Sequence, residues 1–420
     1  MTIIDRLVNR QKNLSLLYTQ PKDGIYFPQG KLITEMLDKL PICVWSNPKL
    51  KFCEVDGGSV LSSEIVIRLM NGLEKFKQNE KERYIYIMNN MIYCYTSSAV
   101  YFNVSKKLLL LENNEIEHNI YNIDFLDTNN DIKFDVTVGI PQHRVRINVG
   151  DNTINLAAVW DDYVIKAFQN TNKEGYVSLI HPCYWRNPSG AFKNIKKLLC
   201  SKKMLHLEIH DSNDGQKIFN TYMRYDWYVC QNLDYDGSKT EVRFQDGTII
   251  NYDLNDMPFI PNGSLKLIKK LLAKNGDEKC NIIHSYSIYN GKKNYVSKNK
   301  SNKFKYPVVY LVHTAGDMTL WYSSKNEGHF GIPKLIWSNG AIKSITSVID
   351  NNGKYGLMPF SYAIVDTTEN LCHIKKAFDS KRFRNLMGDC ELSNGGSRRM
   401  MSFFKKDFWK YFVTKTGKEI

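Results

Sequence analysis

The chain has 420 residues and carries 57 Lys and Arg against 43 Asp and Glu, a formal net charge of +14. This length exceeds what one hydrophobic core usually serves, so we expect two domains. The positive charge favours a polyanionic partner, either nucleic acid or an acidic membrane surface, and no apolar run approaches the length of a membrane span.

The cysteines and the first residues bear on the compartment. The nine cysteines are scattered, odd in number and without a CxxC pair, which favours reduced, buried thiols over a disulfide framework. The first residues lack the apolar stretch of a signal peptide. We therefore expect an intracellular, cytoplasmic protein with no membrane partner. The Asn-, Lys- and Tyr-rich composition suggests an AT-rich genome, and a viral or mobile-element source would place the protein in a host cell or virion.

The first third of the chain alternates helices with short strands. Apolar residues at helical spacing predict helices over residues 1–20, 31–40, 61–76, 82–90 and 99–111, and strands are predicted over 50–55 and 91–96. The turn Asp56-Gly57-Gly58-Ser59 joins the first strand to a helix. Two adjacent glycines there fit an ordinary strand-to-helix turn. They also fit a turn without Cβ atoms that a ligand can approach closely.

The middle of the chain is organised around residues 133–143, KFDVTVGIPQH. Phe134, Val136 and Val138 alternate with more polar residues until Gly139 and Pro141 end the run, which predicts a buried strand that ends in a turn. Further strands are predicted over 121–126, 175–180, 204–210, 218–230 and 240–252, and helices over 157–168 and 192–199. This alternation predicts an α/β fold with ligands where the strands end.

One strand carries a pattern that suggests metal ligands. His206, Glu208 and His210 share a face of the strand predicted over 204–210, because side chains alternate along a strand. No further Cys, Asp or Glu is placed to complete a zinc site. We therefore expect no metal.

The order of these pieces resembles the adenine-N6 DNA methyltransferases of restriction–modification systems, the Type IIG-like enzymes in particular. Residues 133–143 are similar to the family phrase FDVVIGNPPY, and residues 26–29 to its FTP segment. The resemblance implies a Rossmann-like, seven-stranded methyltransferase sheet. It also makes Gly139, Ile140, Pro141, Gln142 and His143 the counterpart of the catalytic loop. The family's Asn and Tyr bind and stack on the extruded adenine, and Ile140 and His143 replace them.

The cofactor motifs are altered in the same way. In the family, DPACGSGNF lets the backbone approach S-adenosylmethionine. Here Glu54, Gly57 and Gly58 occupy a shorter turn without G-x-G spacing. Thr96 stands where the family has the Asp that bonds the ribose, a role that suits a carboxylate. Asp124 matches the family's Asp that contacts the cofactor adenine. An Asp that only caps the end of a strand fits the same pattern.

The C-terminal part has a different character. Two Pro, one Gly and one Asn in residues 256–263 predict a boundary, which places the domains at 1–258 and 259–420. Residues 291–306, GKKNYVSKNKSNKFKY, hold six lysines and no acid. They form either a solvated loop or a surface that contacts phosphates and stacks on bases. Residues 397–411 predict a basic amphipathic helix that either packs in the core or clamps DNA.

Residues 280–390 resemble the target-recognition domain of Type IIG and related methyltransferases. This implies a mixed α+β DNA-binding domain in which exposed cations hold phosphates and polar side chains read base edges. The residues that the resemblance assigns to DNA are Lys292, Lys293, Lys298, Lys300, Lys303, Lys305, Lys325, Asn326, His329, Arg398 and Arg399.

Three functions follow as hypotheses. The first is a double-stranded DNA-binding pseudo-methyltransferase, either an inactive homologue or a non-catalytic subunit. It would have no cofactor, and its further partner would be an active homologous methyltransferase or a second copy of itself. The second is an active adenine-N6 DNA methyltransferase with atypical motifs, which would use S-adenosylmethionine. The third is a scaffold protein that does not depend on DNA.

Overall fold

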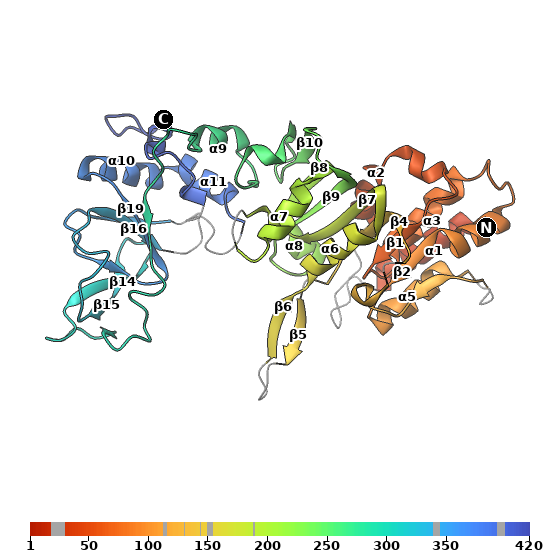
Figure 1. The fold of residues 1–420 in the computed structure, drawn as a ribbon, viewed down its shortest axis with the longest axis horizontal. Coiled ribbons are helices and arrows are strands. Elements are labelled where there is room, and N and C mark those ends of the chain that lie inside the picture. The colour runs from red at the N-terminus through yellow and green to blue at the C-terminus, as the bar shows by residue number, and fades with distance from the viewer. Residues whose placement is uncertain are drawn as a thin grey trace. The chain divides into compact units, whose positions relative to one another are not determined.

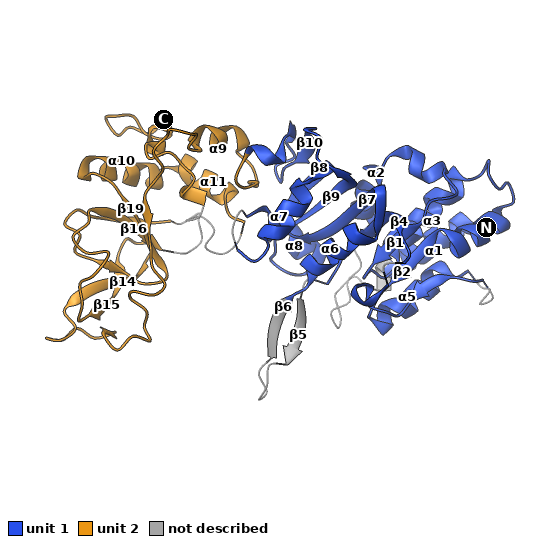
Figure 2. Ribbon diagram, viewed as in Figure 1, with its two compact units in different colours: residues 1–256 blue, residues 257–420 orange. Residues whose placement is uncertain are grey.

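The computed structural model describes residues 1–17, 30–111, 116–129, 131–142, 144–148, 154–187, 190–338, 345–392 and 400–420. It divides into two compact units, residues 1–256 (unit 1) and 257–420 (unit 2), coloured separately in Figure 2. Both units mix helices with strands, as Figure 1 shows. In the described part of the chain, no helix is long and apolar enough to cross a membrane.

Unit 1 is built on a nine-stranded sheet with the strand order β11-β10-β8-β9-β7-β4-β1-β2-β3. The strands are β1 (Phe52–Val55), β2 (Ile92–Tyr95), β3 (Asn119–Tyr121), β4 (Phe134–Gly139), β7 (Thr171–Pro182), β8 (Lys202–His210), β9 (Tyr225–Asp234), β10 (Thr240–Arg243) and β11 (Ile249–Tyr252). The strands β3, β2, β1, β4 and β7 are mutually parallel, and β9 runs antiparallel to β7 and β8. The sheet therefore has nine strands rather than the seven that the resemblance implies, with β10 and β11 at one edge.

Continuous apolar runs place the central strands in the interior. Every residue of β1 and β2 is buried, as expected for parallel strands covered on both faces. The helices of unit 1 are α1 (Ile3–Leu17), α2 (Gly30–Asp38), α3 (Val60–Gly72), α4 (Glu80–Asn90), α5 (Ala99–Leu109), α6 (Trp160–Asn170), α7 (Lys193–Cys200) and α8 (Ser212–Phe219). Helix α6 packs on β7 and α7 on β8, while α1 to α5 pack with one another through α3. The short 3-10 helices are η1 (Ile42–Ser46), η2 (Phe125–Asp127), η3 (Cys183–Arg186) and η4 (Leu254–Asp256).

Three of the differences between the predicted elements of unit 1 and the structure concern the segments around the sheet's carboxyl-terminal strands and Asp124. The strand predicted over 121–126 ends at Tyr121, and Asp124 caps the 3-10 helix η2 instead of closing a strand. The helix predicted over 157–168 begins at Trp160, because the preceding residues pair as the hairpin β5 (Arg144–Asn148) and β6 (Ile154–Ala158). The strand predicted over 218–230 begins only at Tyr225, after α8.

The described residues of unit 2 form two four-stranded sheets, together with the helices given below. One sheet has the order β12-β19-β16-β17, and the other β13-β15-β14-β18. Their strands are β12 (Ile282–Ile283), β13 (Val296–Ser297), β14 (Tyr306–Val312), β15 (Met318–Ser323), β16 (Lys334–Ser338), β17 (Ser347–Asp350), β18 (Gly356–Leu357) and β19 (Ser361–Val365). The helices are α9 (Leu265–Leu271), α10 (Thr368–Asp379) and α11 (Lys381–Asp389), with the 3-10 helix η6 (Phe408–Tyr411) near the C-terminus.

The predicted C-terminal amphipathic helix does not run to Tyr411. Residues 402–411 form turns, two bridge pairings and η6. Phe404 pairs with Leu272, and Lys405 with Lys279, across isolated antiparallel bridges. These pairings use backbone groups that a helix would need for its own hydrogen bonds.

Candidate functional site

The predicted cofactor and catalytic segments meet at one edge of the unit 1 sheet. Val55, at the carboxyl end of β1, pairs with Tyr95 of β2 on one side and Gly139 of β4 on the other. The loops that follow these three strands are therefore neighbours, as expected where parallel strands end. A Cβ at Gly139 would collide with the Val55 carbonyl. Only glycine fits there.

The Glu54 carboxylate occupies the turn at the start of α3. Its side chain is 2% exposed, and its Oε2 accepts a hydrogen bond from the Ser62 amide at 2.7 Å. Burial raises the pKa of Glu54 to about 7, although amides of Ser59, Leu61 and Ser62 oppose the rise. A Cβ at Gly57 would collide with this carboxylate. Amides at a helix N-terminus attract anions, and here one of them, the Ser62 amide, donates to the chain's own Glu54.

The glycines of this turn do not take the left-handed conformations. Those positions belong to Asp56, with φ 54°, and Ser59, with φ 58°, while Gly58 is buried within the turn. An L-residue in the left-handed region costs about 1–2 kcal/mol. In this turn the positive φ angles are therefore taken by Asp56 and Ser59 and not by the two glycines.

Asp56 is the residue that sequence reasoning missed. It is 4% exposed, and its Oδ2 accepts from the Gln142 amide at 2.9 Å. Its Oδ1 has no hydrogen-bond partner among the described residues. Burial raises the pKa of Asp56 to about 7, and the charge of Asp124 adds to the rise, while Gln142 and Thr96 oppose it. Its place directly after a strand and before Gly57 was the available signal.

Thr96 and Asp124 have local partners. Thr96 is 2% exposed, and its Oγ1 accepts from the Ser98 amide at 3.2 Å. The Oδ1 atom of Asp124 accepts from the Leu126 amide at 2.9 Å and from the Tyr163 hydroxyl at 2.8 Å. Asp124 thus combines a capping role with a contact to α6, which sequence reasoning could not foresee.

The loop after β4 is fixed to the turn after β1. Pro141 is buried, and Ile140 packs against the core of unit 1. Besides its amide bond to Asp56, Gln142 donates from Nε2 to Ser97 Oγ at 3.4 Å. His143 lies outside the described residues, as does the predicted FTP-like segment. Ile140 offers no side-chain acceptor to an adenine amino group.

The histidines of β8 bond to carboxylates. His206 lies 3.2 Å from Glu208 through Nε2 and 2.9 Å from Glu241 through Nδ1. His210 Nε2 lies 3.6 Å from Glu208 Oε1, so the predicted common face is confirmed. No group of three such residues suited to a metal ion occurs in the part of the chain that the structure describes.

The positive charge of the protein belongs to unit 2. Residues 257–420 contain 27 Lys and Arg against 12 Asp and Glu, whereas residues 1–256 contain 30 against 31. The six lysines of residues 291–306 are all exposed, and no ion pair involves any of them in the described structure. Three cover aromatic rings: Lys298 lies over Trp321, Lys303 over Phe304 and Lys305 over Tyr306.

The other residues assigned to DNA have different surroundings. Asn326 and Lys325 are exposed, and Lys325 lies 3.6 Å from Glu327. His329 is 6% exposed, and its Nδ1 accepts from the Leu357 amide at 3.2 Å. Burial and the neighbouring Lys334 lower the pKa of His329 to about 4. His329 is therefore a buried, neutral residue. Arg398 and Arg399 lie outside the described residues.

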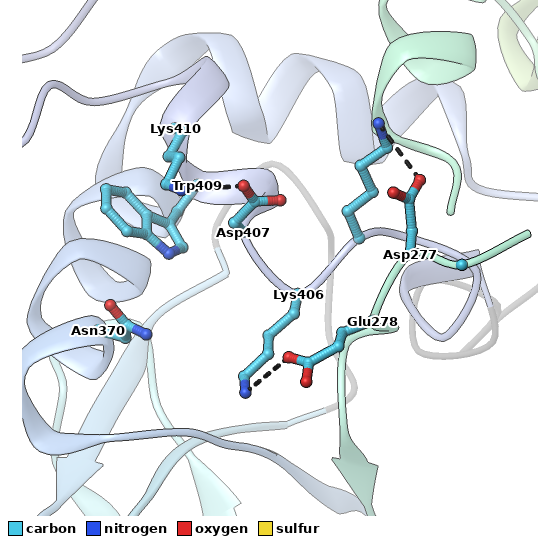
Figure 3. A pocket seen from close by; sticks show the side chains of 9 residues that line it. Asp277, Glu278, Asn370, Lys406, Asp407, Trp409 and Lys410 are labelled. Carbon is cyan, nitrogen blue, oxygen red and sulfur yellow. Dashed lines mark hydrogen bonds and ion pairs between the residues drawn. The ribbon is translucent and has the colours of Figure 1, made fainter. Parts of the chain in front are cut away.

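A second cluster of lysines in unit 2 surrounds a pocket of about 440 Å³. Figure 3 shows its charged side chains in pairs. Lys406 contacts Glu278 at 3.0 Å, Lys410 contacts Asp407 at 3.0 Å, and Lys405 contacts Asp277 at 3.4 Å. These lysines are neutralised locally and suit phosphate contact less well than those of residues 291–306.

Comparison with known proteins identifies the fold. No family profile matches the chain, and no curated protein matches it in sequence. Among solved structures, it is similar to the Type IIL restriction–modification enzyme MmeI in complex with DNA, with TM-score 0.50, 10% identity, and coverage of 94% of this chain and 66% of that one. It is also similar to DrdV in a DNA complex, with TM-score 0.50, 10% identity, and coverage of 95% and 57%.

A modification subunit of a putative type I restriction enzyme from Vibrio vulnificus YJ016 gives TM-score 0.42 at 10% identity, with coverage of 57% of this chain and 51% of that one. The chain thus spans between about half and two thirds of the length of these proteins. Its fold is a methyltransferase-type α/β sheet followed by a mixed α+β unit. It shares this fold with MmeI and DrdV, in line with the resemblance in the sequence.

Proposed function

We propose that this chain is a double-stranded DNA-binding protein on a methyltransferase fold whose own catalytic site is inactive. The proposal of DNA binding is supported by the charge of unit 2, which contains 27 Lys and Arg and 12 Asp and Glu. Exposed lysines without acidic partners release counterions when they neutralise phosphates, which drives binding to any duplex. Both MmeI and DrdV were solved with DNA, which supports the same partner here.

The inactive half of the proposal rests on the turn after β1. S-adenosylmethionine would need the amides at the start of α3 and a ribose ligand at the end of β2. Glu54 already accepts from the Ser62 amide, and Thr96 brings no carboxylate. The residues present therefore do not fit the cofactor in the way the resemblance requires. A non-catalytic subunit that works beside an active methyltransferase, or with a second copy of itself, follows from this arrangement.

One observation favours the alternative of an active adenine-N6 methyltransferase. The Oδ1 atom of Asp56 is buried and has no hydrogen-bond partner in the described part of the chain. The Thr96 side chain lowers the pKa of the same carboxyl group, against the rise caused by burial. A carboxylate from the end of β1 could replace the one missing from the end of β2. Calorimetry with S-adenosylmethionine distinguishes the two. Dissociation in the low micromolar range, about 8 kcal/mol at 1 μM, would support the alternative and defeat the inactive assignment.

DNA binding is tested by its salt dependence. If the six lysines of residues 291–306 contact phosphates, the logarithm of affinity should fall with a slope of about −5 against the logarithm of salt concentration. The triple variant Lys298→Ala, Lys300→Ala, Lys303→Ala should reduce that slope by about 2.7 and weaken binding to all sequences alike. Asn326→Ala should instead reduce discrimination between sites.

The matched control removes the same number of charges from the same unit. Lys405→Ala, Lys406→Ala, Lys410→Ala takes away three lysines that are already ion-paired, so the salt slope should change little. Gel-shift titrations at 50 and 200 mM salt give both slopes. Equal effects of the two triple variants would contradict the assigned surface. No binding of the folded protein to any duplex at low salt would favour the scaffold function.

A further inference from the structure

Phe360 is an aromatic residue at the surface of unit 2. It is 49% exposed and lies in a turn that the Ser361 amide closes by donating to the Met358 carbonyl at 2.9 Å. Pro359 precedes it and fixes one backbone angle of the turn. The Ser361 hydroxyl also donates to the Tyr310 carbonyl at 3.2 Å. The position of residue 360 is thus set before any partner arrives, which lowers the entropy cost of binding.

Phe360 belongs to a row of three aromatic rings in contact, Phe360, Tyr310 and Trp321. Its ring meets Tyr310 at 5.7 Å between centroids, at an interplanar angle of 80°. Tyr310 in turn stacks on Trp321 at 5.5 Å and 19°, and the Lys298 ammonium lies 5.4 Å from the centre of the Trp321 ring. The register between β14 and β15 shifts around Tyr310, which marks a β-bulge. Bulges redirect side chains, and this one lies in the middle of the row.

The charge around the row favours a polyanion. Lys298 belongs to the six exposed lysines of residues 291–306, none of which has an acidic partner among the described residues. An acidic protein surface would satisfy the lysines but gives no reason for an exposed aromatic ring that is linked to Lys298 through Tyr310 and Trp321. Nucleic acid satisfies both, because phosphates take the cations and base faces take the ring.

We propose that Phe360 stacks on a DNA base that has left the duplex stack, while Lys298 and its neighbours hold the adjacent backbone. The inference rests on the proposed DNA binding and adds a preference to it. Opening a base step costs least where pairing is already defective. Unit 2 should therefore favour DNA with a mismatch or an unpaired base over the same duplex fully paired.

The test uses the full chain and three DNA probes of one sequence: a paired duplex, the duplex with one unpaired base, and the single strand. Fluorescence anisotropy gives the affinities, and 2-aminopurine at the unpaired position reports stacking. The unchanged protein should bind the defective duplex more tightly than the paired one. Phe360→Ala should lose about 5- to 150-fold on the defective duplex, the range for one base–aromatic contact. The paired duplex should be little affected, and Phe360→Trp should keep the preference.

Tyr222→Ala is the control, because Tyr222 is an aromatic residue of unit 1 that is 75% exposed. It should change none of the three affinities. If the unchanged protein binds all duplexes equally and Phe360→Ala has no effect, the inference fails while the proposed DNA binding stands. If Phe360→Ala weakens every probe equally, the ring acts on the duplex as a whole and the stacking role is refuted. If no probe binds, the proposed function fails with it.

Discussion

The buried Glu54 carboxyl makes the stability of unit 1 depend on pH, and Glu54→Gln should remove that dependence. Burial raises the pKa of Glu54 from 4.5 to about 7, so the folded state binds the proton more tightly than the unfolded state does. The stability that this group contributes is fully present below pH 4.5 and is lost as the pH rises through 7. At about 1.4 kcal/mol per pKa unit, the loss is about 3 kcal/mol.

Glutamine has nearly the same shape and does not titrate. Its carbonyl can still accept from the Ser62 amide, so the variant loses about 1 kcal/mol at most from a weaker hydrogen bond. At pH 5.5 it should be as stable as the original protein or slightly less stable. At pH 8.5 it should be more stable by about 2 kcal/mol, because the buried charge is absent. Asp56 titrates near the same pH and is unchanged in both proteins, so its contribution largely cancels in the comparison.

The measurement is urea denaturation at pH 5.5, 7.0 and 8.5, with hydrogen exchange of peptides from β1 and α3 to assign the transition to unit 1. Glu82→Gln serves as the control, because the Glu82 side chain is 66% exposed and its replacement should leave the pH profile unchanged. A stability difference between Glu54→Gln and the original protein that stays constant from pH 5.5 to 8.5 would refute the reasoning.

Three further outcomes are expected. The double change Ile140→Asn, Gln142→Pro should not create transfer of a labelled methyl group to DNA, and methyl transfer by that variant would contradict the inactive site. The same variant should destabilise unit 1 by about 1–3 kcal/mol, because proline lacks the backbone amide that donates to Asp56. Asp350→Asn should lower the melting temperature of unit 2 by removing about 3–5 kcal/mol, because Lys334 is 0% exposed and contacts Asp350 at 2.8 Å. Adding Lys334→Met should recover most of the loss. Gly57→Ala should destabilise unit 1 by about 1–3 kcal/mol in urea titrations, because the new Cβ would collide with the Glu54 side chain. An unchanged urea midpoint would show that the turn can adjust to the added methyl group.

The elements that sequence predicted well are those whose signal is local. Runs of apolar residues marked β1, β2, β4, β7 and β8, and helical spacing marked α3 to α5, because each pattern reflects burial on one or both faces of the same element. The resemblance of residues 133–143 to a methyltransferase motif also predicted the fold from a local signal, because the strand and the loop after it are contiguous in the sequence. The elements that were misplaced, such as α8 and the segment after β4, lie where turns and short pairings compete with periodicity.

The sequence by itself determined the α/β class, the succession of the central strands along the chain and the lysine-rich segment of residues 291–306. Only the tertiary structure decided which of the polar residues are available. Tertiary packing buries His329, pairs Lys405 and Lys406 with acids, and brings Asp56 next to the loop of Gln142, which lies 86 residues further along the chain. Whether a charge or a hydrogen-bonding group is free depends on partners from distant segments, and one-dimensional periodicity carries no information about those partners.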